Sequence, residues 1–374
     1  MNSTAIKNWA QKPRSIEIEW SDGHTSTFHH IWLRDNAPSN RHPNGQKLGD
    51  ITQIPPDISP ASVTAAEKLR IEWAHDGQVD EFDPAWLRAN AYEPGEVRKR
   101  RWRPALWDSA TIAGVPIDFD YPHVANSDRK LEEMLGSVRD YGFAILHAVP
   151  TEPGSIFQVV DLFGYVRVTN YGPLFDVRVT PNPTNLAFTG LTLGGHTDNP
   201  YRHPVPTLQL LHFLENSVQG GDSTLVDGFQ VARQLRQARP QEFELLASTP
   251  VTFRFASEDA DLKYESTIIE RDASGEVSGI RFNNRSVQAF YCPPDQMEAF
   301  YEAYRSFGRL LEDPANKITF KLGRGDLMIF DNQRILHGRI GYQAGGERHL
   351  QGCYADKDSL LSRLAVLERQ VSGS

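Results

Sequence analysis

One stretch of the chain decides how the rest is interpreted: Gly194-Gly195-His196-Thr197-Asp198-Asn199-Pro200-Tyr201. The His–Asp pair lies where a strand-like run gives way to a loop, next to glycines that let other groups approach closely. On a strand, residues i and i+2 point to the same face, so His196 and Asp198 would project together. Such a triplet also arises by chance among 12 histidines and 48 acidic residues, and a hydrogen-bonded His–Asp pair at a strand end is the alternative.

His337 and Arg348, both far downstream in the sequence, favour a metal site over an isolated His–Asp pair. His337 follows a strand-like run and precedes a glycine, and Arg348 opens the next such run. Two histidines and one carboxylate form the facial triad of non-haem Fe(II) oxygenases, which leaves coordination positions open. A guanidinium at Arg348 would hold a distant carboxylate through two parallel hydrogen bonds. Taken alone, His337 could be an ordinary surface histidine and Arg348 an ordinary surface arginine. Together with His196 and Asp198, however, they favour an iron site.

The composition restricts the class of protein. The chain has 374 residues, a net charge of −9, 39% hydrophobic residues and 23% charged residues, as expected for a globular protein of about two domains. The acidic balance argues against nucleic acid or an anionic membrane as a partner. Two cysteines, Cys292 and Cys353, exclude a disulfide framework. Since the chain has neither a membrane-span-like stretch nor a signal-peptide core at its start, we expect a cytoplasmic location.

The N-terminal part has its own texture. Apolar and charged residues alternate at 15–20 and 69–73, which predicts strands with one face in water, and the Pro-, Asn- and Ser-rich residues 37–60 predict a loop. The basic run at 98–103 resembles a linker. We therefore expect a small β-rich N-terminal domain over residues 1–103 and a larger domain over residues 104–374.

The larger region mixes helical and strand periods. Helices are predicted at 127–140, with Ser127 as N-cap, at 227–247 and at 294–312. Strands are predicted at 143–146, 207–214, 251–255, 280–283, 318–322, 327–330 and 349–354. Many short strands with interposed helices indicate a mainly β fold with helices, in which the catalytic domain is a double-stranded β-helix, or jelly roll.

With these motifs in view, the chain resembles the Fe(II)/2-oxoglutarate-dependent dioxygenases of the gamma-butyrobetaine dioxygenase and trimethyllysine dioxygenase group, relatives of taurine dioxygenase. The resemblance spans residues 15–369 and rests on segments 195–201, 208–212, 220–228, 281–284, 332–338, 348–356 and 362–364. It implies an oxidoreductase that consumes O2 and 2-oxoglutarate, hydroxylates an unactivated C–H bond and releases succinate and CO2. It also implies a homodimer. The implied iron ligands are His196, Asp198 and His337, and the implied cosubstrate-binding residues are Arg348 and Ser223.

The resemblance further implies a small trimethylammonium substrate, held in an aromatic cage by cation–π attraction. The matching cage positions are Tyr171, Phe175, Phe188 and Tyr354, each of which would otherwise be ordinary barrel core. The residues expected at the substrate's anionic end are Asn185, Tyr201, Asn284 and Arg285. A full charge at Arg285 suits a phosphonate at least as well as a carboxylate. The expected substrate is therefore gamma-butyrobetaine or 2-(trimethylammonio)ethylphosphonate.

One segment departs from the family. Related enzymes have a Cys-rich zinc knuckle after the motif at residues 32–36, but residues 37–42 contain no cysteine. A single histidine does not hold a tetrahedral structural zinc, so we predict no zinc there. Two alternative functions stay open: the same catalyst acting on another small anion, such as a sulfonate or a trimethylated amino acid, and a non-catalytic barrel that binds a small molecule.

Overall fold

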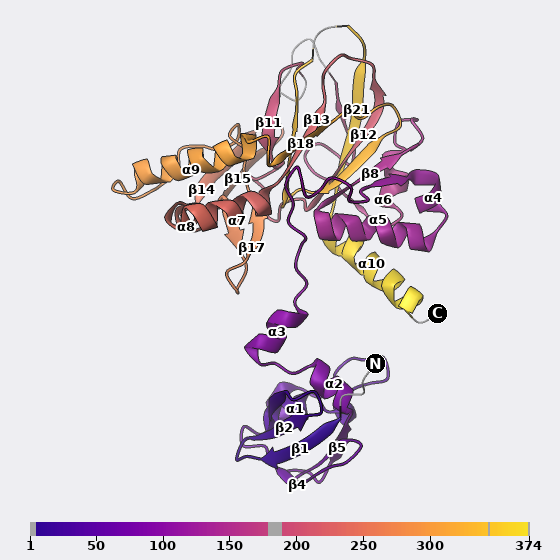
Figure 1. Cartoon of the computed structure of the whole chain (residues 1–374), viewed down its shortest axis with the longest axis vertical. Helices are drawn as coiled ribbons and strands as arrows, with labels where there is room; N and C mark the ends of the chain where they lie inside the picture. The colour runs from indigo at the N-terminus through magenta and orange to yellow at the C-terminus, as the bar shows by residue number, and fades with distance from the viewer. Residues whose placement is uncertain (1–4, 179–188, 343–344, 373–374) are drawn as a thin grey trace. The chain divides into compact units, whose positions relative to one another are not determined.

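The chain folds into two compact units, Met1–Trp102 and Arg103–Ser374. The computed structural model describes residues 5–178, 189–342 and 345–372 (Figure 1). Within these ranges, no helix has both the length and the apolar character needed to cross a membrane.

The first unit contains two antiparallel three-stranded sheets and short helices. On β2, Ile16, Ile18 and Trp20 are buried between more exposed neighbours, as the alternation predicted. The basic run, expected as a linker, is partly helical, since α3 includes residues 98–100. The strands and helices are β1 (Ile6–Gln11), β2 (Ser15–Trp20), β3 (Thr25–His29), α1 (His30–Asp35), β4 (Pro60–Ala65), β5 (Leu69–Trp73), β6 (Val79–Phe82), α2 (Pro84–Ala89) and α3 (Pro94–Arg100).

The second unit is built on a seven-stranded sheet with the order β10-β21-β12-β19-β8-β7, in which β9 also pairs with β21. All its pairs are antiparallel except β7 with β8. Its strands are β7 (Asp118–Asp120), β8 (Phe143–His147), β9 (Val166–Arg167), β10 (Phe175–Val177), β12 (Leu208–Asn216), β19 (Leu327–Asp331) and β21 (Arg348–Ala355).

A four-stranded sheet with the order β11-β20-β13-β18 forms the second sheet of this unit. Its strands are β11 (Leu193–His196), β13 (Ser223–Asp227), β18 (Lys317–Phe320) and β20 (Ile335–Arg339). Two separate hairpins accompany it: β14 (Val251–Ala256) with β15 (Asp261–Ser266), and β16 (Ile269–Arg271) with β17 (Val277–Ile280). The mainly β architecture with helices is thus confirmed.

The two faces of the seven-stranded sheet have different environments, because successive side chains on a strand point to opposite faces. On β12, Leu208 and Leu210 pack into a core shared with the neighbouring helices. The intervening Gln209, Leu211 and Phe213 line a cavity on the opposite face. The sequence pattern of β12 therefore places one face in the core and the other in the cavity.

Helices cover the second unit in two groups (Figure 1). The first comprises α4 (Tyr121–Ala125), α5 (Asp128–Tyr141), α6 (Ile156–Val160) and α10 (Lys357–Ser372), of which α5 and α10 pack together. Ser127 caps α5 as predicted, accepting a hydrogen bond from the Lys130 amide. The second group comprises α7 (Gly228–Ala238), α8 (Pro240–Ser248) and α9 (Met297–Glu312).

Several expected element boundaries were wrong, and two of them have a clear physical reason. The single helix expected at 227–247 is two helices, because Pro240 lacks the amide that would continue α7 and instead begins α8. The strand expected at 280–283 ends at Ile280 as β17. The residues after it bond to the loop that carries Asp198 instead, with the Thr197 amide donating to the Phe282 carbonyl.

A buried ion pair between Arg334 and Asp227 joins the end of β13 to the segment before β20. Arg334 donates to both carboxylate oxygens of Asp227, at 3.1 and 2.8 Å, and to the carbonyls of Asp140 and Ala105. Both charged side chains are almost completely buried. Asp227 also caps α7 by accepting from the amides of Phe229 and Gln230. The pair therefore fixes the start of α7 against the segment before β20.

We predict that Arg334→Met lowers the free energy of unfolding by about 3–5 kcal/mol, because it leaves the Asp227 carboxylate buried without its cation. Urea denaturation would measure the loss. The matched control is Arg129→Met, which removes one partner of the exposed Arg129–Glu133 pair and should cost less than about 1 kcal/mol. Equal losses in the two variants would contradict the prediction.

Candidate active site

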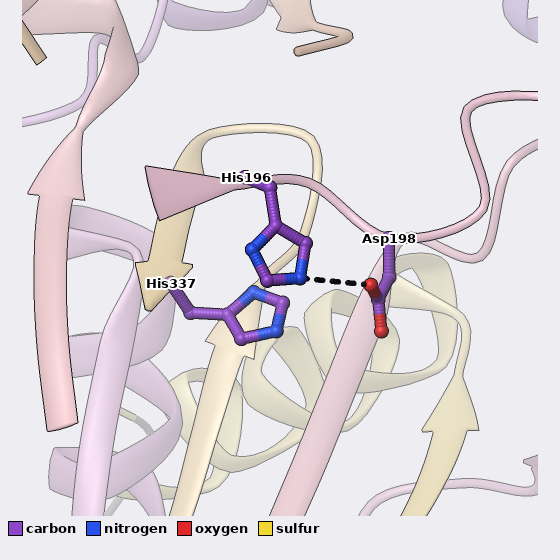
Figure 2. A group of neighbouring side chains, drawn as sticks. All are labelled: His196, Asp198 and His337. Carbon is purple, nitrogen blue, oxygen red and sulfur yellow. Dashed lines mark ion pairs between the residues drawn. The ribbon is translucent and has the colours of Figure 1, made fainter. Parts of the chain in front are cut away.

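The side chains of His196 and Asp198, which are neighbours in the sequence, meet that of the distant His337 (Figure 2). His196 ends β11 and faces His337 of β20 as a direct cross-strand partner, with ring centroids 4.3 Å apart. Asp198 lies in the loop after β11, with Oδ1 3.3 Å from His196 Nε2. One ligand atom from each residue lies within 4.8 Å of the other two. The strand ends before Asp198, and His337 lies within β20 rather than after a strand as expected.

The loop conformation that carries Asp198 is held on both sides. Asn332 accepts from the Asp198 amide at 2.7 Å and donates to its carbonyl at 2.9 Å. Asn199 has φ of 56°, in the left-handed region that asparagine tolerates better than most residues. Because Asp198 lies in the loop after β11, these contacts, and not strand pairing, hold its backbone in place.

The two oxygens of the Asp198 carboxylate have separate environments. Oδ1 faces His196, whereas Oδ2 accepts hydrogen bonds from Gln209 Nε2 and from the Tyr354 hydroxyl, both at 2.9 Å. Burial disfavours the charge, but the hydrogen bonds with His196 and Tyr354 and the proximity of the two imidazoles outweigh it and hold the pKa of Asp198 well below its usual range. The carboxylate is thus ionised, with Oδ1 facing His196.

Each imidazole offers a nitrogen to a metal. His196 Nδ1 lies 2.9 Å from the Gly194 carbonyl, so Nε2 is the nitrogen that faces Asp198. Burial, and then the proximity of His196, lower the pKa of His337 to about 3, so this ring is neutral at neutral pH. His337 Nδ1 is buried and has no hydrogen-bond partner. Two imidazoles and one carboxylate suit a ferrous ion and leave positions for other ligands.

The three side chains line a cavity of about 470 Å³. Two sheets and the β14–β15 hairpin contribute to its wall. The sequence-predicted residues that line it are Tyr171, Phe175, His196, Asp198, Tyr201, Ser223, Arg285, His337, Arg348 and Tyr354.

Three other predicted residues do not join this set. Asn284 lines a neighbouring pocket beside α9, where its side-chain oxygen accepts from the Tyr304 hydroxyl. Asn185 and Phe188 lie outside the residues that the structure describes.

An unpaired cation occupies one part of the cavity wall. Arg348 has its guanidinium 5.4 Å from the Phe213 ring centroid and 5.6 Å from that of Tyr342, and its buried Nε has no partner. Burial, and then the charge of Arg339, lower the pKa of Arg348 to about 10, so it stays charged at neutral pH. Its side-chain hydrogen bond is with Tyr342, and no acidic side chain in the described ranges forms an ion pair with it. The carboxylate of a small ligand would satisfy this charge.

Sequence reasoning missed several residues of the site. Gln209 and Asn332 form hydrogen bonds with Asp198. Phe255 and Asn199 line the cavity, and Asn199 accepts a hydrogen bond from the Tyr201 hydroxyl. The alternation on β12 is the one sequence signal for Gln209, since its neighbours are core leucines. Phe255 gives no such signal, because the hairpin that carries it folds back onto the cavity only in the tertiary structure.

Comparison with known proteins agrees with this chemistry. Residues 106–354 match the family described as taurine catabolism dioxygenase TauD, TfdA family, and residues 7–88 match the family described as gamma-butyrobetaine hydroxylase-like, N-terminal. The chain is 38% identical to a gamma-butyrobetaine dioxygenase of Pseudomonas sp. (strain AK-1), over 95% of this chain and 94% of that protein. It is 32% identical to the gamma-butyrobetaine dioxygenase of Homo sapiens, over 95% of each chain.

More distant similarities extend the comparison. A trimethyllysine dioxygenase of Meyerozyma guilliermondii is 29% identical, over 94% of this chain and 93% of that protein. Among solved structures, PvcB of Pseudomonas aeruginosa aligns with a TM-score of 0.47 at 22% identity, over 62% of this chain and 81% of that chain.

The converging side chains and the match to the gamma-butyrobetaine dioxygenases define an oxidoreductase of the dioxygenase class. The chain belongs to the TauD, TfdA dioxygenase family. Iron(II) is its cofactor, and 2-oxoglutarate and O2 are its cosubstrates.

We predict that His337→Ala weakens binding of Mn²⁺, used as a redox-stable probe of the iron site, by at least about 100-fold, because one of three protein ligands is lost. Calorimetric titration of the metal-free protein would measure the affinity. The control is His123→Ala, since His123 is exposed and pairs with Asp120 away from the cavity. Retention of wild-type affinity in His337→Ala would rule out this ligand set.

Proposed function

We propose that the enzyme hydroxylates an unactivated C–H bond of a small substrate with a trimethylammonium group at one end and an anion at the other. One observation carries this proposal: an arc of aromatic rings and a charged arginine line the same cavity as His196, Asp198 and His337. The names of the relatives, gamma-butyrobetaine dioxygenase and trimethyllysine dioxygenase, support a trimethylammonium substrate.

The proposed ligands of the iron are His196, Asp198 and His337, and Arg348 is proposed to bind the distal carboxylate of 2-oxoglutarate. When bound, iron would bring O2, the oxidant, together with 2-oxoglutarate: one oxygen atom of O2 would enter the substrate as a hydroxyl group and the other would enter succinate, which forms with CO2 as 2-oxoglutarate is decarboxylated. Arg348 has the buried, unpaired charge that such a carboxylate needs. Ser223 lines the same cavity from β13 and offers a hydroxyl to the same cosubstrate.

The proposed cage for the trimethylammonium group is a row of rings in contact. Phe175 lies 5.3 Å from Tyr354 and 6.0 Å from Tyr171, and Phe255 lies 5.7 Å from Tyr171, centroid to centroid. A cation that is held against several ring faces and shielded from water gains cation–π attraction. Gly352 makes the row possible, because a Cβ there would come within 2.4 Å of the Phe175 ring.

The proposed partner of the substrate's anion is Arg285. It lines the cavity, and no side chain in the described part of the chain takes a hydrogen bond from its terminal nitrogens. Arg254, which also lines the cavity, already donates twice to Asp261. The buried Asn199 Nδ2, which also lacks a partner, is a second donor at the cavity wall. Together they suit a carboxylate or a doubly charged phosphonate.

Several broader features belong to the same proposal. We propose that the two sheets of the second unit form a jelly roll, because both contribute side chains to one cavity. We propose a cytoplasmic location, which the two free, buried cysteines support. We also propose a homodimer, which the family resemblance supports. The lack of a structural zinc in residues 37–42 stays a prediction.

The test is a substrate panel with the iron-loaded enzyme, 2-oxoglutarate and O2, in which succinate release is measured. We predict that gamma-butyrobetaine or 2-(trimethylammonio)ethylphosphonate stimulates succinate release strongly. The matched control, 4-aminobutyrate, keeps the carboxylate but has a well-hydrated ammonium, so it should stimulate little. Stimulation by taurine or trimethyllysine alone would favour the alternative substrates, and no stimulation by any compound would favour a non-catalytic barrel.

We predict that Arg285→Gln raises the KM for the phosphonate by about 10- to 100-fold, and the KM for the carboxylate less, because a charge-assisted hydrogen bond contributes about 1.5–3 kcal/mol. Steady-state kinetics on both substrates would measure the difference. The control is Arg305→Gln, since Arg305 is exposed, pairs with Glu302 and lies outside the cavity. Unchanged KM values for both substrates in Arg285→Gln would remove Arg285 from the substrate site.

A further inference from the structure

Tyr354 takes part in two sites at once. Its ring belongs to the aromatic row, 5.3 Å from Phe175. Its hydroxyl donates at 2.9 Å to Asp198 Oδ2, on the carboxylate proposed to bind iron. A single rigid side chain with two rotatable bonds therefore spans the distance from the cage to the metal ligand.

The strand register explains why this contact forms. Tyr354 on β21 and Gln209 on β12 are direct cross-strand partners in the seven-stranded sheet. Their side chains point to the same face, and both donate to the same oxygen of Asp198. Because this face also lines the cavity, the sheet positions Asp198 from the side opposite the imidazoles.

The two donors differ in what else they touch. Gln209 is buried beside Asp198, and its side-chain oxygen has no hydrogen-bond partner. Tyr354 instead has its ring against Phe175, so a group entering the cage contacts that ring.

We propose that Tyr354 is a positioning residue whose hydroxyl orients the Asp198 carboxylate for the metal and whose ring makes metal binding depend on occupancy of the cage. The coupling half of this inference rests on the proposed function, because it requires a trimethylammonium group in the cage. A ligand that fixes the Tyr354 ring also fixes its hydrogen bond to Asp198. By linkage, the metal must then strengthen binding of that ligand by the same factor.

The test compares wild-type enzyme with Tyr354→Phe, which keeps the ring and removes the hydroxyl. Mn²⁺ affinity is measured by calorimetry without 2-oxoglutarate, first with the metal alone and then with saturating gamma-butyrobetaine. With the metal alone, we expect Tyr354→Phe to bind Mn²⁺ about ten-fold more weakly, as is typical when a residue that orients a metal ligand is lost. With gamma-butyrobetaine, we expect wild-type affinity to rise about five-fold or more, and that of the variant to stay unchanged.

Turnover gives a separate readout. Tyr354→Phe should lower kcat and leave the KM for gamma-butyrobetaine within about two-fold, because the ring that contacts the substrate is still present. The control is Tyr121→Phe, which removes a tyrosine hydroxyl bonded to Gln158 outside the cavity and should bind Mn²⁺ as the wild type does.

Two results would overturn the inference: wild-type Mn²⁺ affinity in Tyr354→Phe with the metal alone, or an equal rise with gamma-butyrobetaine in both proteins. If gamma-butyrobetaine does not bind the wild type, the proposed function fails, whereas the metal-alone comparison still tests the role of the hydroxyl. If Tyr354→Phe does not fold, Gln209→Met removes the other donor. That variant should bind Mn²⁺ more weakly but keep the response to gamma-butyrobetaine, and loss of the response there would count against Tyr354.

Discussion

The pairing of β11 with β20 brings His196 and His337 face to face across one pair of antiparallel strands. Antiparallel partners lie about 5 Å apart, so two imidazoles on the same face share a single position for a metal ion. Close approach of the strands beside this pair requires Gly338, where a Cβ would lie 2.6 Å from the Leu193 carbonyl. Every other feature of the site is arranged around this contact.

Asp198, the third proposed ligand, needs more support because it comes from a loop. Asp198 is held through its backbone by Asn332 and through Oδ2 by two donors on the other sheet. Each sheet therefore supplies part of the centre: the four-stranded sheet the imidazoles, and the seven-stranded sheet the groups that orient the carboxylate. These hydrogen bonds from both sheets orient the carboxylate, which is what positioning of a reactive metal requires.

The cavity combines this centre with two opposite electrostatic environments. The aromatic row from Tyr354 through Phe175 to Tyr171 and Phe255 presents ring faces that attract a cation. Arg285 and Arg348 present positive charge to anions. Because both arginines are buried enough to lower their pKa values yet stay charged, each gains most from an anionic ligand. A zwitterionic substrate and a dicarboxylate cosubstrate match these environments.

The sequence alone determined the strand and helix types and the Ser127 cap, and it predicted the candidate metal ligands, because these follow from local periodicity and from motifs read in order. It did not determine where the helix at 227–247 breaks, that β20 contains His337, or that Phe255 reaches the cavity. Only the tertiary structure decided which oxygen of Asp198 faces the imidazoles and that Tyr354 donates to the other. Such contacts depend on strand register and loop conformation, which join residues more than a hundred positions apart and leave no local pattern.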